Sequence, residues 1–292
     1  MRFPLLLTLL APFLLGAQPL EQTLLWRIGS QKGGASSYLY GTMHTKDERA
    51  FQFGDSVLPA LDRSTVVAGE LDLAIGDQGI GLLKRMWMPN GKQLKDLYRK
   101  KDWIRVEKAL NERLGMAAPM LYRVKPMFVE AMLSESTMGG ARSQVLDEYL
   151  QVRARDLGKR VIGVETIDEQ LGAMDALTVK EQAKMLLDHV DHDGYPKELD
   201  AMLDAYAAQD LEGLLGAAEK SGSMPKAMEQ ALITERNTRM VHRMDSLLQG
   251  GEGMFFLIGA AHLPGTTGLI LGMRAKGYQV QPVISGRRED EK

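Results

Sequence analysis

Residues 254–265 read Met254-Phe-Phe-Leu-Ile-Gly-Ala-Ala-His262-Leu-Pro-Gly265, an apolar run of strand length that stops at a G-x-x-H and breaks at Pro-Gly. The first half of the chain repeats this order in Tyr38-Leu-Tyr-Gly-Thr-Met-His44. Two of the five histidines therefore occupy matching contexts more than 200 residues apart. Because the carboxyl ends of strands gather ligands in open α/β sheets, this pair predicts one site shared by His44 and His262.

The composition is that of a folded protein with a sizeable core. The chain has 292 residues, 45% hydrophobic and 25% charged, with a formal net charge of −2. Nucleic-acid-binding proteins usually carry an excess of basic residues, and this chain does not, so we expect no nucleic-acid partner. The chain has no cysteine, so any metal must be bound by histidine, carboxylate, amide or water. Such donors favour hard or borderline ions.

The N-terminus resembles a secretory signal peptide, with one basic residue, a short apolar core and small residues at its end. We therefore expect residues 1–17 to be a signal peptide and residues 18–292 to form a single domain. The predicted location is secreted, in a bacterial periplasm, without stable membrane insertion after cleavage. An uncleaved anchor is the alternative, although the apolar run is short for a membrane-spanning helix.

Strand and helix patterns alternate along the chain. Short strands at 23–28 and 37–40 predict a hairpin around two glycines, and a helix at 55–62 precedes a buried strand at 65–73. The remaining expected elements are a mainly helical region at about 76–222 that contains a strand at 159–166, a long helix at 224–248, a helix at 267–276 and an edge strand at 278–284. This order predicts an α/β protein with a central mixed sheet flanked by helices and a large helical insertion.

Carboxylates accompany two of the strand patterns. Glu70 interrupts the apolar run at 65–73, and Glu165 follows the apolar run that ends at Val164. A carboxylate in such a place is expensive to desolvate unless a cation, a metal or a hydrogen-bond donor meets it. Glu70 and Glu165 therefore join His44 and His262 as candidate site residues. A purely structural pair with Arg or Lys is the alternative for Glu70.

Two polar residues lie on the long helix at 224–248. Asn237 interrupts its apolar stripe, so the amide must find a partner there. Arg236 beside it supplies a cation that could bind Glu70, Glu165 or an anionic group of a substrate. The alternative is that both residues only tie helices together.

A second polar cluster lies at 188–193, where the predicted helix ends. It contains three aspartates together with His189 and His192. A solvated helix end explains such a cluster better than a cation site, so we leave these histidines out of the predicted site.

The chemistry of the candidate residues leaves more than one reaction open. His44, Glu70, Glu165 and His262 could bind a divalent metal and leave a position for water. The same set could work without a metal, with a histidine as general base. The sequence lacks the G-x-S-x-G, H-E-x-x-H and P-loop motifs and has no cysteine nucleophile, which disfavours those hydrolase and nucleotidase classes.

Six segments, in order along the chain, resemble the motifs of the TraB/PrgY/GumN family. They are Leu39-Tyr-Gly-Thr-Met-His44, Val67-Ala-Gly-Glu-Leu71, Leu146-Asp-Glu-Tyr-Leu150, Gly163-Val-Glu-Thr-Ile-Asp-Glu-Gln170, Glu235-Arg-Asn237 and Gly259-Ala-Ala-His-Leu-Pro-Gly265. That family is related to the Tiki metalloproteases and more distantly to erythromycin esterase and ChaN-like iron or haem proteins. The resemblance implies an α/β core with a helical insertion and a paired G-x-x-H site. It does not imply a particular substrate.

The resemblance also implies roles for individual residues. His44 and His262 match the motif histidines, Glu70 the acidic partner, and Arg236 and Asn237 the helix-borne partners, whereas Glu165 and Asp147 match without a defined role. We therefore predict a secreted, metal-dependent hydrolase of the Tiki-like peptidase type, acting on a peptide or a small molecule. Two alternatives remain: a non-catalytic periplasmic protein that binds a metal, haem or a peptide, and a metal-free esterase-like hydrolase.

Overall fold

The structure is a computed structural model that describes residues 20–29, 35–74, 85–137, 140–220 and 224–284. The predicted signal peptide and the two glycines of the predicted hairpin lie outside these residues. Within the described ranges, no helix combines the length and the hydropathy needed to span a bilayer.

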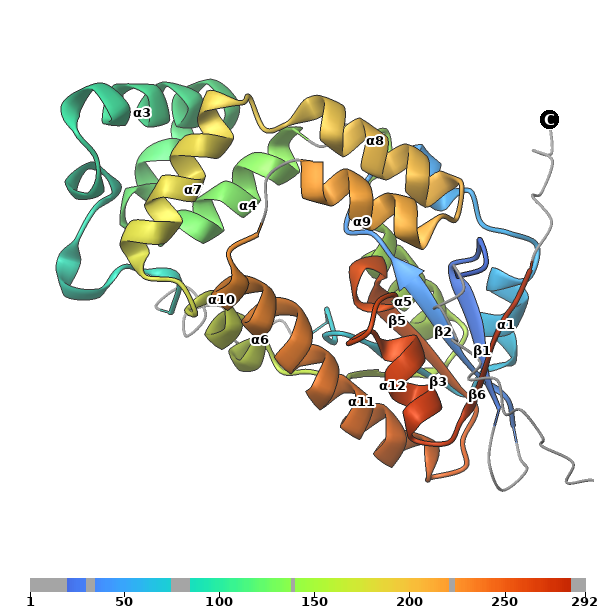
Figure 1. Ribbon diagram of the computed structural model, residues 1–292. Coiled ribbons are helices and arrows are strands. Elements are labelled where there is room, and N and C mark those ends of the chain that lie inside the picture. Colours follow the sequence, from blue (N-terminus) through green and yellow to red (C-terminus); the bar gives the residue numbers. More distant parts are fainter. Residues whose placement is uncertain (1–19, 30–34, 75–84, 138–139, 221–223, 285–292) are drawn as a thin grey trace, which may run out of the picture.

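One six-stranded mixed sheet forms the centre of the fold (Figure 1). Its strands are β1 Leu25–Gly29, β2 Ser37–Thr42, β3 Val66–Gly69, β4 Arg160–Gly163, β5 Met254–Gly259 and β6 Gln279–Pro282, in the spatial order β4-β3-β5-β2-β1-β6. The first four strands in this order run parallel, whereas β1 pairs antiparallel with both β2 and β6. The predicted α/β class, the mixed sheet and the last strand at an edge are confirmed.

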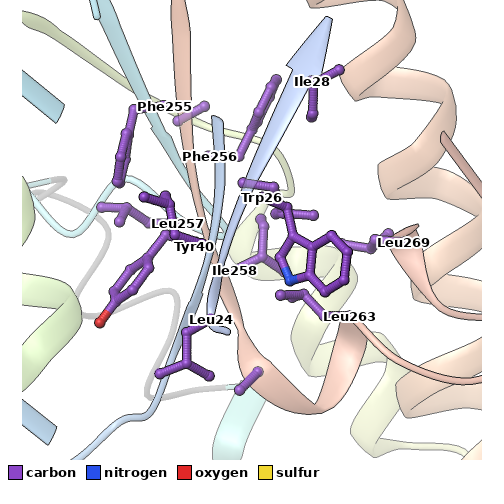
Figure 2. Close-up of a cluster of buried hydrophobic side chains, with 14 of the residues drawn as sticks. Leu24, Trp26, Ile28, Tyr40, Phe255, Phe256, Leu257, Ile258, Leu263 and Leu269 are labelled. Atoms are coloured by element: carbon purple, nitrogen blue, oxygen red, sulfur yellow. The ribbon is translucent and has the colours of Figure 1, made fainter. Parts of the chain in front are cut away.

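Strand β5 lies at the middle of the parallel block and is covered on both faces. Phe255 and Leu257 point to one side of the sheet, Phe256 and Ile258 to the other (Figure 2). All four are at most 1% exposed, which explains the continuous apolar run in the sequence, since a strand buried on both faces has no polar side.

Helices cover the two faces of the sheet. On the face of Tyr40 lie α8 (Pro196–Ala207), whose Tyr206 hydroxyl donates to the Tyr40 hydroxyl at 3.4 Å, and α5 (Leu146–Asp156), whose Tyr149 ring stacks on Phe53 next to Tyr40. On the face of Trp26 lies α12 (Leu269–Ala275), which packs on α11 (Glu235–Leu248) (Figures 1 and 2). The sheet therefore lies between two helical layers.

A second hydrophobic cluster lies away from the sheet. It joins α3 (Lys100–Leu114), α4 (Pro126–Thr137), α6 (Ile167–Met174) and α7 (Val179–Asp191) around residues such as Val106, Leu110, Val129 and Leu186. Most of region 76–222 is helical, as predicted, but α5, α8, α9 (Leu211–Lys220) and β4 contribute to the core of the sheet instead. We call α3, α4, α6 and α7 the helical lobe.

The remaining described elements are short: α1 Val57–Arg63, α10 Lys226–Glu229, a π-helix at Gln230–Thr234, and 3₁₀ turns at Glu48–Phe51, Pro89–Gly91, Leu94–Leu97, Gly115–Arg123 and Ala260–His262. Two predictions need correction. The strand predicted at 65–73 ends at Gly69, so Glu70 follows the strand rather than interrupting it. The helix predicted at 224–248 is divided by the π-helix, which ends just before the α11 residues Arg236 and Asn237.

The predicted solvated helix end at 188–193 is correct for one histidine and wrong for the other. His192 is exposed, whereas His189 is only 7% exposed and its Nδ1 lies 4.0 Å from Glu130 Oε1 of α4. Arg105 and Arg113 of α3 form ion pairs with Asp191 and Asp193. Packing between helices therefore buries part of a segment that looked fully solvated in the sequence.

Candidate functional site

The four parallel strands end at the same edge of the sheet. Thr42 pairs with Gly259, and Gly69 pairs with both Leu257 and Gly163. One to three residues beyond these ends, in the order of the strands across the sheet, come Glu165, Glu70, His262 and His44. The predicted side-by-side placement of these four residues is therefore what the sheet topology produces.

The two G-x-x-H segments also pack against each other. A Cβ on Gly41 would lie 3.3 Å from Ala260 Cα and 3.2 Å from Leu263 Cδ2. A Cβ on Gly259 would lie 2.9 Å from Glu70 Oε1. Each glycine thus permits a close approach that a larger residue would obstruct. The strand predicted at 37–40 is longer in the structure and extends to Thr42, so Gly41 lies within β2.

Glu70 is held at three points. Its Oε1 accepts a hydrogen bond from Gly259 N at 2.6 Å, and its Oε2 accepts from Arg236 Nη2 at 2.6 Å and Gln170 Nε2 at 3.1 Å. The carboxylate is therefore held in one orientation while its side chain is only 23% exposed, because these donors replace the lost water.

Glu165 is fully buried behind this carboxylate. Its Oε2 accepts from Arg236 Nε at 2.9 Å and from Nη2 at 2.7 Å, and its Oε1 lies 3.6 Å from Arg239 Nη2. Arg236 thus lies between Glu165 and Glu70, as the sequence allowed. Glu165 also differs from Glu70 in exposure, since its side chain is 0% exposed and that of Glu70 is 23% exposed. A fully buried carboxylate that faces two guanidinium groups is poorly placed to bind a metal, so we leave Glu165 out of the proposed ligands.

His262 is buried in the turn after β5 and held by Asn237. Its Nδ1 lies 2.6 Å from Asn237 Oδ1, while Asn237 Nδ2 donates to Thr267 O at 2.9 Å. Because the amide NH₂ is used by Thr267, its oxygen faces the ring, and this assigns the proton of the neutral imidazole to Nδ1. The other nitrogen, Nε2, lies 3.9 Å from Glu70 Oε1. Burial lowers the pKa of His262 to about 4, so the ring is neutral at neutral pH.

His44 has the opposite environment. Its side chain is 64% exposed, and Nδ1 lies 3.5 Å from Asp147 Oδ2. The Asp147 carboxylate beside the ring raises the pKa of His44, and the charges of Glu135 and Glu70 add to this. Thr42 Oγ1 donates to Asp147 Oδ1 at 2.5 Å, which fixes the carboxylate.

The structure joins five of the predicted site residues in one network and places the sixth beside it. Glu70, Glu165, Arg236, Asn237 and His262 are linked by contacts of 2.6–3.9 Å. His44 follows the neighbouring strand, and no hydrogen bond or ion pair links it to Glu70 or His262 among the described residues. Its partner is Asp147.

Sequence reasoning missed two glutamines. Gln170 donates to Glu70, and Gln151, which is 2% exposed, binds Leu71 O at 2.8 Å and Leu73 N at 3.0 Å. Gln151 thereby fixes the loop after Glu70. A signal for Gln151 was present, because it lies beside the apolar stripe of Leu146, Leu150 and Ala154, much as Asn237 interrupts the stripe of α11.

The donor chemistry fits a divalent metal. Both histidines have an oxygen of Asn237 or Asp147 facing Nδ1, which is the usual arrangement for imidazoles that bind a metal through Nε2, and Glu70 supplies a carboxylate. The described residues nevertheless contain no group of three or more His, Asp or Glu close enough to hold a metal in this conformation. His44, His262 and Glu70 therefore match a divalent metal in the chemistry of their donor atoms and lie at the same edge of the sheet.

A surface hollow of about 690 Å³ lies elsewhere, beside the helical lobe. Its lining includes Trp87, Arg123, Lys125, Asp175 and Thr178, and none of the candidate site residues. Arg123 lies over the Trp87 ring, and Lys125 pairs with Asp175 at 2.5 Å. The size of this hollow is therefore no argument for the location of the site.

These features define a class of α/β protein in which parallel strands end in a histidine and carboxylate network held by an arginine and an asparagine of one helix. The chain belongs to the TraB/PrgY/gumN family, whose model matches residues 24–282.

Curated relatives of the chain are metalloproteases. Metalloprotease TIKI2 of Danio rerio is 26% identical over 91% of this chain and 63% of its own length. Metalloprotease TIKI1 of Homo sapiens is 24% identical over 90% and 62%, and the TIKI homolog of Nematostella vectensis is 25% identical over 85% and 64%. The match thus spans less than two thirds of these relatives. No solved structure matches the chain significantly.

Proposed function

We propose that this protein is a metal-dependent hydrolase that cleaves peptide bonds, with His262, Glu70 and His44 at the centre of its site. Its relatives carry the name metalloprotease, and its own strand ends supply two imidazoles and a carboxylate at one edge of the sheet. We also propose that residues 1–17 direct secretion, to a periplasm if the cell is a Gram-negative bacterium.

The observation that carries the proposal is the way in which Asn237 holds His262. Because Nδ1 faces the amide oxygen at 2.6 Å, the free electron pair of the neutral ring is on Nε2, which faces Glu70. A merely packed histidine needs neither this tautomer nor a carboxylate beside its second nitrogen. The same arrangement suits a metal ligand that must remain unprotonated at neutral pH.

The protein side chains have separable roles in this proposal. His262, His44 and Glu70 would hold the ion, which when bound would activate water and polarise the carbonyl of the scissile bond. Arg236 and Gln170 orient Glu70, Arg236 also balances its charge, and Asn237 fixes the tautomer of His262. Glu165 keeps Arg236 in place from its buried side.

Metal analysis with a hydrolysis screen tests the proposal. Purified protein is assayed on peptide and ester libraries before and after chelation, and again after addition of Zn²⁺ or Mn²⁺. We expect peptide cleavage that chelation abolishes and one of the ions restores. Ester cleavage that resists chelation would instead support a metal-free esterase, and tight binding of a metal, haem or a peptide without turnover would support a binding protein.

A further inference from the structure

Asp147 is placed to control the ring of His44. It lies in the first turn of α5, and the Thr42 hydroxyl donates to its Oδ1 at 2.5 Å. Its other oxygen, Oδ2, is buried and makes no hydrogen bond within the described part of the chain, yet lies 3.5 Å from His44 Nδ1. The carboxylate thus has one oxygen fixed by a donor and one directed at the imidazole.

The backbone holds this carboxylate in register with the His44 loop. Leu146 N, next to Asp147, donates to Thr45 O, next to His44, at 3.1 Å. The ring of His44, in contrast, is 64% exposed. A contact of 3.5 Å is longer than a normal hydrogen bond, and contacts of this kind often shorten when a site is filled.

We infer that Asp147 is a positioning residue that accepts Nδ1–H from His44 and so presents Nε2 of His44 to the edge of the sheet. The physical reason is that a buried, unpaired carboxylate oxygen is costly, and Nδ1 of His44 lies 3.5 Å from it. The two G-x-x-H histidines then share one tautomer, imposed by an amide on His262 and by a carboxylate on His44. Only the effect on metal binding and turnover rests on the proposed function.

Substitution by asparagine is a sharp test because the Thr42 hydroxyl also orients the amide. If Thr42 keeps donating to the oxygen, then Asp147→Asn turns its NH₂ toward His44 Nδ1. A donor in that place favours the tautomer with the proton on Nε2, so the substitution inverts the tautomer without removing bulk. Asp156→Asn, at the exposed far end of α5, is the matched control.

The readout is histidine side-chain ¹⁵N NMR of the full chain at about pH 9, where the imidazole is neutral. The signal of His44 is assigned by its loss in His44→Gln. We expect an Nδ1–H tautomer in the wild type and in Asp156→Asn, and Nε2–H in Asp147→Asn. An Nε2–H tautomer in the wild type, or the same tautomer in Asp147→Asn, would overturn the inference.

A titration with Zn²⁺ extends the test to function. We expect Asp147→Asn to weaken Zn²⁺ binding by about 10- to 100-fold, as loss of such partners does, and Asp156→Asn to leave it unchanged. Absence of Zn²⁺ binding by the wild type would count against the proposed metal centre. The NMR measurement of the His44 tautomer would still decide the role of Asp147 in that case. Equal Zn²⁺ affinity in Asp147→Asn and wild type would contradict the inference.

Discussion

The two G-x-x-H segments have the same local pattern and opposite surroundings. His44 is 64% exposed and faces a carboxylate, which raises its pKa, whereas His262 is 6% exposed and faces an amide, and burial lowers its pKa to about 4. The side chains of the neighbouring elements cause this difference, because α5 supplies Asp147 and α11 supplies Asn237. A repeated motif therefore specifies where a ring is placed, while its proton affinity depends on the elements packed around it.

The largest expected effect concerns activity and tests whether the two histidines act together. We expect His44→Ala and His262→Ala each to lower turnover by about 100-fold or more, and the double variant to lose little beyond the worse single one, because groups that act as a unit are strongly non-additive. Steady-state kinetics on the substrate found in the screen measures this. Independent losses that multiply in the double variant would separate the histidines into two sites.

Arg236→Ala should cause the largest loss of stability. The substitution leaves Glu165, whose side chain is fully buried, and Glu70 without their shared cation, and breaking such a pair costs about 3–5 kcal/mol. Denaturant unfolding measures it, with Arg160→Ala as control because that arginine is exposed and pairs with Glu252 at the surface. Adding Glu165→Gln to Arg236→Ala should recover part of the loss, and no recovery would argue against the network.

Glu130 tests the role of burial in a group outside the site. Burial raises the pKa of this carboxyl to about 7, with a contribution from Asp188, while His189, Tyr98 and Tyr195 also face it. Burial also lowers the pKa of His189. The sign for Glu130 is the reverse of that for His262, because burial disfavours the charged form of either group.

The stability contributed by Glu130 is fully present below its unfolded pKa and is lost as pH rises through about 7. Glu130→Gln removes this loss. We therefore expect the variant to gain about 2–3 kcal/mol over the wild type between pH 5 and pH 8, since one pKa unit corresponds to about 1.4 kcal/mol. Thermal or denaturant melts across this range measure it, and a parallel pH dependence of the two proteins would refute the assignment.

Asn237→Ala should lower stability by about 1–3 kcal/mol, because it leaves Thr267 O and His262 Nδ1 without their partner. It should also release the tautomer of His262, which ¹⁵N NMR can follow. Asn111→Ala, at an exposed position of α3, is the control. An unchanged tautomer would show that Asn237 only ties α11 to the loop at 263–268.

The smallest expected effect is the stability change in His44→Ala. An exposed ring contributes little packing, and its removal opens Asp147 Oδ2 to water, so we expect a loss of no more than about 1 kcal/mol, and a clearly larger loss in His262→Ala. Paired denaturant melts compare the two. Equal losses would contradict the contrast in burial that separates the two loops.

Several predictions from the sequence depended on local pattern alone and are confirmed. The apolar run from Met254 to Gly259 forms a strand, and the Asn237 amide on the apolar stripe of α11 finds partners in Thr267 and His262. The strand before Glu70 is shorter than predicted and ends at Gly69. A strand ends where its backbone pairing ends, and the pattern of apolar residues does not show that point. The burial of His189 was not predictable from the sequence. Its neighbours in the sequence are polar, which suggested exposure, and only the packing of α7 against α4 shows that the His189 side chain is covered.

The sequence by itself determined the α/β class, the mixed sheet and the strand ends that His44, Glu165 and His262 follow, whereas the end of β3 before Glu70 came from the structure. These follow from periodicity and from the rule that parallel strands end at one edge, which requires only short-range information. Only the tertiary structure decided which side chains face each histidine and which carboxylates share Arg236. Those contacts join residues from 25 positions apart, for Asn237 and His262, to 166 positions apart, for Glu70 and Arg236, and to 192 for Glu70 and His262. The packing of α5 and α11 against the sheet sets them.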